Sequence, residues 1–270
     1  MKRPYIFYFP GYCRSNGIRV KLILAQKLAE AGYEVLHYVR DSTNWPTDIP
    51  TLKTVDRNLR DRAVAVYPEI TAGNPLRVRN VARLVLFYPG RNGGMRRYHK
   101  SEMLFAYLPE FLPGADVLTI PCMDTDLFNN PGLPRTKDYC FVHKGGRWKE
   151  PPELRDVPTI TMDWPKTREE LADILKHTKT LYSFDNVSAV LDEALQCGAK
   201  VMIVTKDGYC EYKNNYPRMV SQFPAQFLNF VKRTQSSDYR GRIQSRFLPL
   251  HWANVAWRYW IKPYFTCTKH

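Results

Sequence analysis

Short apolar runs alternate with stretches of helical periodicity in the first part of the chain. Tyr5–Phe9 is apolar and aromatic, and the turn-rich residues 10–17 follow it, which predicts a strand that leaves into a loop. Apolar residues then recur at helical spacing over residues 18–29, before Gly32 ends the helix and residues 34–39 form a second strand. A strand–helix–strand unit of this kind is typical of parallel sheets, which bind ligands at their carboxyl edge.

The same alternation continues toward the middle of the chain. Residues 63–67 and 115–120 are apolar runs that predict further strands, and residues 76–88 between them predict a helix. Residues 129–134, with the sequence Asn-Asn-Pro-Gly-Leu-Pro, have the composition of a linker. We therefore expect an N-terminal domain over residues 1–134 and a C-terminal domain over residues 135–270.

The second half of the chain repeats the pattern of the first. It predicts strands at residues 139–143, 159–161, 180–183 and 200–204, and helices at residues 167–176 and 186–196. Repeated strand–helix units are typical of doubly wound parallel sheets. The sequence thus predicts an α/β protein of two Rossmann-like domains that face each other across a ligand cleft.

Positive charge is unevenly distributed along the chain. Lysine and arginine total 40 against 26 acids, which gives a formal net charge of +14. Residues 77–100 contain seven basic residues and no acid, and residues 231–270 contain eight basic residues and only Asp238 as an acid. Two basic patches of this size are either solvated surface or sites for anions such as phospholipid, nucleoside diphosphate or nucleic acid.

Several features bear on cellular location. The chain has no signal-peptide pattern and no apolar stretch long enough to span a membrane, and its six cysteines are scattered. We therefore expect a cytoplasmic protein with reduced thiols. Residues 252–260 predict an amphipathic helix with Trp252, Tyr259 and Trp260 on one face. That helix either docks on the protein itself or attaches it to the inner face of an anionic membrane.

Some chemistries find little support in the sequence. It contains neither the glycine-rich dinucleotide fingerprint nor a P-loop, which argues against dehydrogenases and kinases. The six histidines form no evident pair with a nucleophile, so a hydrolase triad is disfavoured. Asp124-Thr125-Asp126 matches the Asp-x-Asp pattern of a metal-binding motif, but it lies just before the predicted linker. We expect no bound metal and no cofactor.

The most informative stretch covers residues 181–201. A predicted strand ends at Ser183, and a predicted helix begins at Asn186 with Ser188 in its first turn. Backbone N–H groups at a helix start, together with two serine hydroxyls, form a suitable site for a diphosphate. Asp185 and Glu193 are the carboxylates of this stretch, and local physics alone would make them a helix cap and an ordinary surface residue.

This stretch resembles the donor-binding element of the GT-B glycosyltransferases, which bind a nucleotide sugar. The resemblance rests on the strand, the small polar loop and the run Glu-Ala-Leu-Gln-Cys-Gly at residues 193–198. It implies that Glu193 binds the ribose hydroxyls of the nucleotide and that Asp185 lies near the donor sugar. Retaining members have glutamate at both positions, so the aspartate is a departure from the family pattern.

Further residues extend the resemblance. Residues 139–147 are similar to the family's basic loop, which implies that Lys144 and Arg147 neutralise the leaving nucleoside diphosphate without a metal. Asn16 and Gly17 resemble the loop and helix start near the donor and acceptor. Residues 67–90, which include Glu69, are similar to enzymes that build bacterial capsular and other surface polysaccharides.

These features predict a metal-independent glycosyltransferase that is retaining, with a surface-polysaccharide or lipid-linked glycan as its acceptor. An inverting enzyme would instead need a general base, for which Glu69 and His99 are the candidates. Two alternatives stay open. The enzyme could glycosylate nucleic acid, such as modified bases of viral DNA, or the protein could be a non-catalytic module that binds sugar nucleotides or polyanions.

Overall fold

The computed structural model describes residues 2–12, 15–40, 45, 47–143 and 151–236. The chain divides into two compact units, which we call unit 1 (Met1–Pro121 with Met219–His270) and unit 2 (Cys122–Arg218). The structure therefore does not divide at residue 134, where we expected a single domain boundary. The reason is a long helix, α5 (Tyr216–Ser236), through which the chain returns to unit 1.

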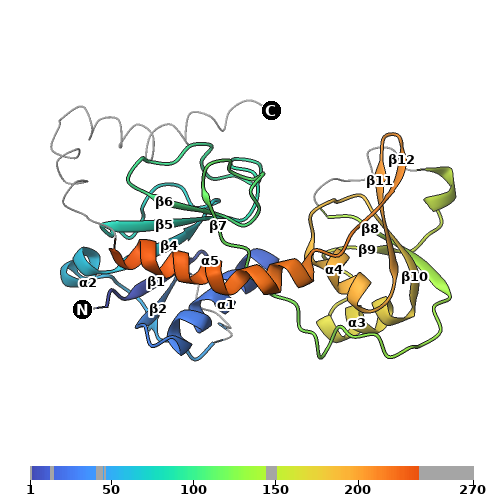
Figure 1. Cartoon of the computed structure of the whole chain (residues 1–270), viewed down its shortest axis with the longest axis horizontal. Coiled ribbons are helices and arrows are strands. Elements are labelled where there is room, and N and C mark those ends of the chain that lie inside the picture. Colours follow the sequence, from blue (N-terminus) through green and yellow to red (C-terminus); the bar gives the residue numbers. More distant parts are fainter. Residues whose placement is uncertain (1, 13–14, 41–44, 46, 144–150, 237–270) are drawn as a thin grey trace. The chain divides into compact units, whose positions relative to one another are not determined.

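Unit 1 is built on a seven-stranded sheet in the order β3-β2-β1-β4-β5-β6-β7, and every neighbouring pair is parallel (Figure 1). The strands are β1 (Tyr5–Phe9), β2 (Val35–Val39), β3 (Thr51–Leu52), β4 (Val64–Pro68), β5 (Asn80–Val85), β6 (Met103–Ala106) and β7 (Asp116–Val117). The predicted strands at residues 5–9, 34–39 and 63–67 are confirmed as β1, β2 and β4.

Helices cover both faces of this sheet. Helix α1 (Asn16–Glu30) begins at Ser15, whose side chain accepts a hydrogen bond from the backbone N–H of Ile18, as an N-cap does. The short helix α2 (Arg57–Arg62) packs Leu59 against the face that carries Ile6. Helix α5 packs against the opposite face, where Phe230 stacks on Tyr5 with ring centroids 5.9 Å apart.

The prediction of a helix at residues 76–88 is wrong, because those residues contain strand β5. All six residues of β5 are buried, as in a central strand of a parallel sheet that is covered on both faces. Such a strand shows no alternation of polar and apolar residues, so its pattern could be mistaken for a buried helix. The chain reaches β5 through a tight turn in which Arg77 adopts a φ of 56°.

Unit 2 contains a five-stranded sheet in the order β12-β11-β10-β8-β9. The strands are β8 (Lys137–Phe141), β9 (Thr159–Ile160), β10 (Thr178–Ser183), β11 (Lys200–Thr205) and β12 (Gly208–Glu211). All neighbouring pairs are parallel except β11 and β12, which form an antiparallel hairpin at the edge. The four strands predicted in this half are confirmed, and both units are Rossmann-like α/β folds.

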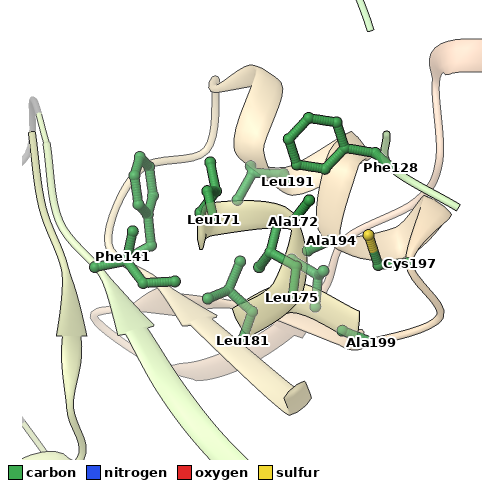
Figure 2. Packing of buried hydrophobic residues seen from close by; sticks show 12 residues of the cluster. Phe128, Phe141, Leu171, Ala172, Leu175, Leu181, Leu191, Ala194, Cys197 and Ala199 are labelled. Carbon is green, nitrogen blue, oxygen red and sulfur yellow. The ribbon is translucent and has the colours of Figure 1, made fainter. Parts of the chain in front are cut away.

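Two helices pack on one face of the unit 2 sheet. They are α3 (Arg168–His177), which begins with a complete capping box formed by Thr167 and Glu170, and α4 (Ala189–Gln196). Figure 2 shows Leu171 of α3 and Leu191 of α4 meeting above the sheet residue Leu181. The predicted helices at residues 167–176 and 186–196 are confirmed, although α4 begins at Ala189.

The opposite face of the unit 2 sheet is covered differently. A short 3₁₀ helix, η1 (Pro152–Leu154), packs Leu154 against Cys140 of β8 and Val204 of β11. Within the connection from β8 to β9, η1 therefore lies on this face, whereas α4, in the connection from β10 to β11, lies on the other. The described elements that follow β8 and β10 thus lie on opposite faces of the sheet.

Candidate functional site

The strand order of unit 2 reverses between β8 and β10. These strands are neighbours, with Phe141 of β8 in register with Ser183 of β10, but the chain continues from them to opposite sides of the sheet. Ligands of open α/β sheets bind in the crevice that such a reversal leaves at the carboxyl ends of the strands. We call this place the unit 2 switch point.

A hydrogen bond joins the two loops at the unit 2 switch point. The backbone N–H of His143, after β8, donates to Oδ2 of Asp185, after β10, over 2.6 Å. Asp185 is only 6% exposed. Ser183, fully buried, donates its hydroxyl to the backbone carbonyl of Asp185 over 2.6 Å and accepts from the backbone N–H of Asp185 over 3.1 Å. Both side chains thus shape the loop between β10 and α4.

The start of α4 lies at the same edge. Ser188 is its N-cap, and the Ser188 side chain accepts a hydrogen bond from the backbone N–H of Val190 over 3.4 Å. Asn186 is exposed on the loop before it. The structure therefore brings together Ser183, Asn186 and Ser188, which were predicted around the diphosphate, and Asp185, which was predicted near the donor sugar.

Glu193 lies on α4 and is fully buried. Its two carboxylate oxygens accept hydrogen bonds from the guanidinium of Arg168, at 2.8 and 3.3 Å. Arg168 is the first residue of α3, and its guanidinium also lies 4.4 Å from the ring centroid of Phe128. Sequence reasoning did not single out Arg168. The local signal that could have found it is the capping box, which places Arg168 in the first turn of α3.

Asp192 is a second buried carboxylate on α4, which the sequence also did not single out. It accepts hydrogen bonds from the Tyr212 hydroxyl over 3.2 Å and from the backbone N–H of Asn215 over 3.4 Å. Burial raises the pKa of Asp192 to about 6, and the neighbouring charge of Glu193 adds to the rise.

The predicted basic loop is only partly described. Lys144 and Arg147 lie outside the described residues, which stop at His143 on this side of the loop and resume at Pro151. What the structure does describe is the anchor of the loop, because the hydrogen bond to Asp185 holds the residue that directly precedes Lys144.

Unit 1 has a strand-order reversal of its own, between β1 and β4. Glu69 follows β4 directly, is 5% exposed, and accepts a hydrogen bond through Oε2 from the backbone N–H of Leu86 over 3.1 Å. Gly17, in the first turn of α1 after Asn16, approaches the same place, since a Cβ atom there would lie 3.4 Å from the Leu86 side chain. Asn16, Gly17 and Glu69 therefore gather at the carboxyl edge of unit 1.

Arg83 supports the loop that carries Glu69. It is fully buried in β5 and donates hydrogen bonds to the backbone carbonyls of Pro68, Thr71 and Gly73, at 3.2, 2.7 and 2.8 Å. Its Nε also forms an ion pair of 2.8 Å with the buried carboxylate of Glu102. A charge this deeply buried needs such a complete set of partners. The sequence showed Arg83 only as one member of a basic stretch.

Two histidines are relevant to proton chemistry in unit 1. His99, the alternative general base, is partly buried and its Nδ1 lies 2.7 Å from the Ser101 hydroxyl. His37 is fully buried in β2, and its Nδ1 accepts a hydrogen bond from the Trp45 indole over 3.0 Å. Burial lowers the pKa of His37 to about 4, and the nearby charge of Lys21 contributes to the fall.

The Asp-x-Asp sequence forms a turn. Oδ1 of Asp124 accepts hydrogen bonds from the backbone N–H groups of Asp126 and Leu127, at 3.2 and 3.0 Å. Within the described ranges, no group of three or more His, Cys, Asp or Glu side chains is placed to hold a metal ion. The same ranges contain no helix whose length and apolar character would allow it to cross a membrane.

Comparisons with known proteins give one kind of match. No protein-family model matches the chain, and no curated protein matches it. Forty-four chains of solved structures match, and one of them is a Listeria monocytogenes protein provisionally described as a UDP-N-acetylglucosamine 2-epimerase. The match covers 91% of this chain and 95% of that chain, at 9% identity and a TM-score of 0.39. At that level of similarity, the fold assignment rests on the strand order of the two sheets.

Proposed function

We propose that this protein is a glycosyltransferase that takes a nucleotide sugar at unit 2 and an acceptor at unit 1. The observation that carries the proposal is the unit 2 switch point. The stretch that resembles the GT-B donor element folds there as β10, α4 and β11. Its polar residues thus lie at the edge where an open α/β sheet binds its ligand.

In this proposal the start of α4 receives the diphosphate. Backbone N–H groups in the first turn of a helix attract an anion, and Ser188 and Asn186 add polar groups beside them. Lys144 and Arg147 would supply positive charge to the leaving nucleoside diphosphate, in place of a metal ion. Asp185 acts as a positioning residue, because its carboxylate holds the start of the loop that contains both cations.

Glu193 is proposed to bind the ribose hydroxyls together with Arg168. Each carboxylate oxygen has two lone pairs, so a carboxylate that accepts from a guanidinium retains the capacity to accept from a diol. The Arg168 guanidinium supplies the countercharge that a fully buried carboxylate requires. On this account, Arg168 fixes the orientation in which Glu193 meets the nucleotide.

The acceptor side is proposed to be the edge of unit 1 that carries Glu69. In an inverting reaction Glu69 would remove the proton from the attacking hydroxyl, whereas in a retaining reaction it would orient the acceptor. The proposed acceptor is a surface-polysaccharide or lipid-linked glycan. The stereochemistry can be determined by NMR of the product.

The test of the proposal combines binding and turnover with the full chain. A thermal-shift screen against nucleoside diphosphates and nucleotide sugars should identify a ligand, because a ligand at 100 times its dissociation constant stabilises the folded state by about 2.7 kcal/mol. Release of nucleoside diphosphate from the best donor, with glycan acceptors added, then measures transfer. A donor that binds and turns over supports the proposal, and the absence of any nucleotide ligand contradicts it.

One observation favours a second candidate, a non-catalytic module that binds sugar nucleotides. Both carboxylates of the family pattern already have protein partners, Asp185 at His143 and Glu193 at Arg168. A binding module would need no group to take part in bond exchange. Tight binding of a nucleotide sugar without any release of nucleoside diphosphate, with or without acceptor, would favour this candidate.

A further inference from the structure

The loop between β5 and β6 carries a group of exposed cations. They are Arg91, Arg96, Arg97 and Lys100, which we call the basic loop of unit 1. In the described part of the chain, none of these four side chains forms an ion pair. Their charge is therefore available to a partner outside the fold.

The basic loop is held against the segment that carries Glu69. Gly94 adopts a φ of 74°, and a Cβ atom at this position would overlap the backbone of Glu69 and Ile70. Next to it, buried Met95 accepts a hydrogen bond at its sulfur from the backbone N–H of Gly73 over 3.4 Å. These two anchors hold the middle of the basic loop against the segment that follows β4, at the carboxyl edge of unit 1.

A third anchor lies further along the loop. The ring of Tyr98 lies with its centroid 5.5 Å from the guanidinium carbon of Arg83, which itself supports the Glu69 segment. Burial raises the pKa of Tyr98, so its hydroxyl remains neutral and brings no negative charge into the group. The loop is consequently a built part of this edge.

The acids near the basic loop do not offset its charge. Residues 69–121 contain four acids, Glu69, Glu102, Glu110 and Asp116. Glu102 pairs with Arg83, Asp116 pairs with Arg233, and Glu69 is buried against the backbone N–H of Leu86. Only Glu110 is exposed, which leaves the four exposed cations of the basic loop against one exposed acid in this stretch. An excess of this kind concentrates anions at the edge it surrounds.

We infer that the acceptor at unit 1 carries a phosphate group, which the basic loop binds next to Glu69. This inference rests on the proposed function and specifies its acceptor chemistry. Arginine presents its N–H donors in a planar fork that matches phosphate oxygens, and three of the four cations are arginines. A phosphate held there would orient the hydroxyl that Glu69 approaches.

The test measures binding of two phosphate compounds by the full chain. The probes are farnesyl phosphate and inorganic phosphate, with farnesol as the uncharged control and a mixed-sequence oligonucleotide as the alternative anion. The test variant combines Arg91→Gln, Arg97→Gln and Lys100→Gln. It leaves Arg96 in place because the Arg96 side chain lies across Gly90. The matched variant combines Lys179→Gln, Lys200→Gln and Lys232→Gln, three exposed residues whose loss changes the net charge equally.

The expected result is that the wild-type chain and the matched variant bind a phosphate compound alike, whereas the test variant binds it at least tenfold more weakly. Binding of farnesyl phosphate alone identifies a lipid-linked phosphate, and equal binding of inorganic phosphate shows that the phosphate group suffices. Three outcomes overturn the inference. They are equal binding of the phosphate compounds by all three proteins, binding of neither phosphate compound, and loop-dependent binding of the oligonucleotide alone. Nucleotide-sugar affinity, measured on the same variants, reports separately on the proposed function.

Discussion

Asp185 accepts a hydrogen bond of 2.6 Å from the backbone N–H of His143, and this bond joins the loops that leave two neighbouring strands of unit 2. The described elements that follow these two strands, η1 and α4, lie on opposite faces of the sheet. The Asp185 carboxylate therefore holds the backbone of His143, the residue that directly precedes Lys144. The position of these two cations depends on Asp185 in our account.

Asp185→Ala is expected to weaken nucleotide-sugar binding tenfold or more, because a hydrogen bond to a charged group contributes roughly 1.5 to 3 kcal/mol. Asp185→Asn keeps an acceptor atom and should fall between the wild type and the alanine variant. Isothermal titration calorimetry measures these affinities, with the exposed Asp207→Ala as the matched control. An Asp185→Ala variant that is folded and binds with wild-type affinity would refute the positioning role.

Arg168→Met is expected to destabilise unit 2 by about 3 kcal/mol, because it leaves the buried carboxylate of Glu193 without its countercharge. Adding Glu193→Gln removes that charge and should restore part of the lost stability. Urea denaturation of the two single variants and the double variant completes the cycle. Additive effects of the two substitutions would show that the pair is not coupled.

The raised pKa of Asp192 leads us to predict that the stability of the fold depends on pH. Its pKa is about 6 in the folded chain, against 3.8 as the reference value, so between these pH values the folded state holds a proton that the unfolded chain has released. The free energy of unfolding therefore falls as pH rises through this window. Asp192→Asn should remove this pH dependence. The free energy of unfolding of the variant should therefore exceed that of the wild type by an amount that grows from near zero at pH 4 to about 1 to 3 kcal/mol at pH 7.

The comparison must be made as a difference between variant and wild type. His37 acts in the opposite direction, because its lowered pKa of about 4 makes the unfolded chain the better proton acceptor between pH 4 and 6.5. The stability associated with His37 is thus lost as pH falls, and it cancels in the difference. Urea denaturation at pH 4, 5.5 and 7, with Asp207→Asn as the control, measures the effect. A difference that does not change with pH would contradict the raised pKa.

Donor turnover is expected to continue in excess EDTA, because the charge at the diphosphate is assigned to Lys144, Arg147 and the start of α4. The measurement is the release of nucleoside diphosphate after dialysis against the chelator. Complete loss of turnover that manganese restores would instead require a metal site, with Asp124 and Asp126 as the first ligands to test.

Much of the fold could be predicted from sequence, because its periodic elements are local. The helix α1 and all four predicted strands of unit 2 follow from apolar spacing and turn residues within each segment. The same reasoning predicted a helix at β5, since a strand that is buried on both faces lacks alternation. Helix α5 was not predicted. It contains Pro224, and it packs against β1, more than 200 residues away in the sequence, through the pair formed by Phe230 and Tyr5.

The candidate site could be predicted only in part, for a similar reason. A strand end and a helix start lie close together in sequence, so Ser183, Asn186 and Ser188 could be placed at one edge. The partners of the carboxylates lie further away. Arg168 precedes Glu193 by 25 positions, and His143 precedes Asp185 by 42. Those pairings depend on how neighbouring strands and helices pack, which a single sequence does not encode in any local pattern.

The most direct test of the central claim is to titrate the full chain with a panel of nucleotide sugars and compare it with Glu193→Ala. We predict that at least one nucleotide sugar binds, that Glu193→Ala weakens its binding tenfold or more, and that the exposed Glu169→Ala on α3 leaves it unchanged. If no nucleotide sugar binds, or if it binds the folded Glu193→Ala variant with wild-type affinity, unit 2 is not the donor site that we propose.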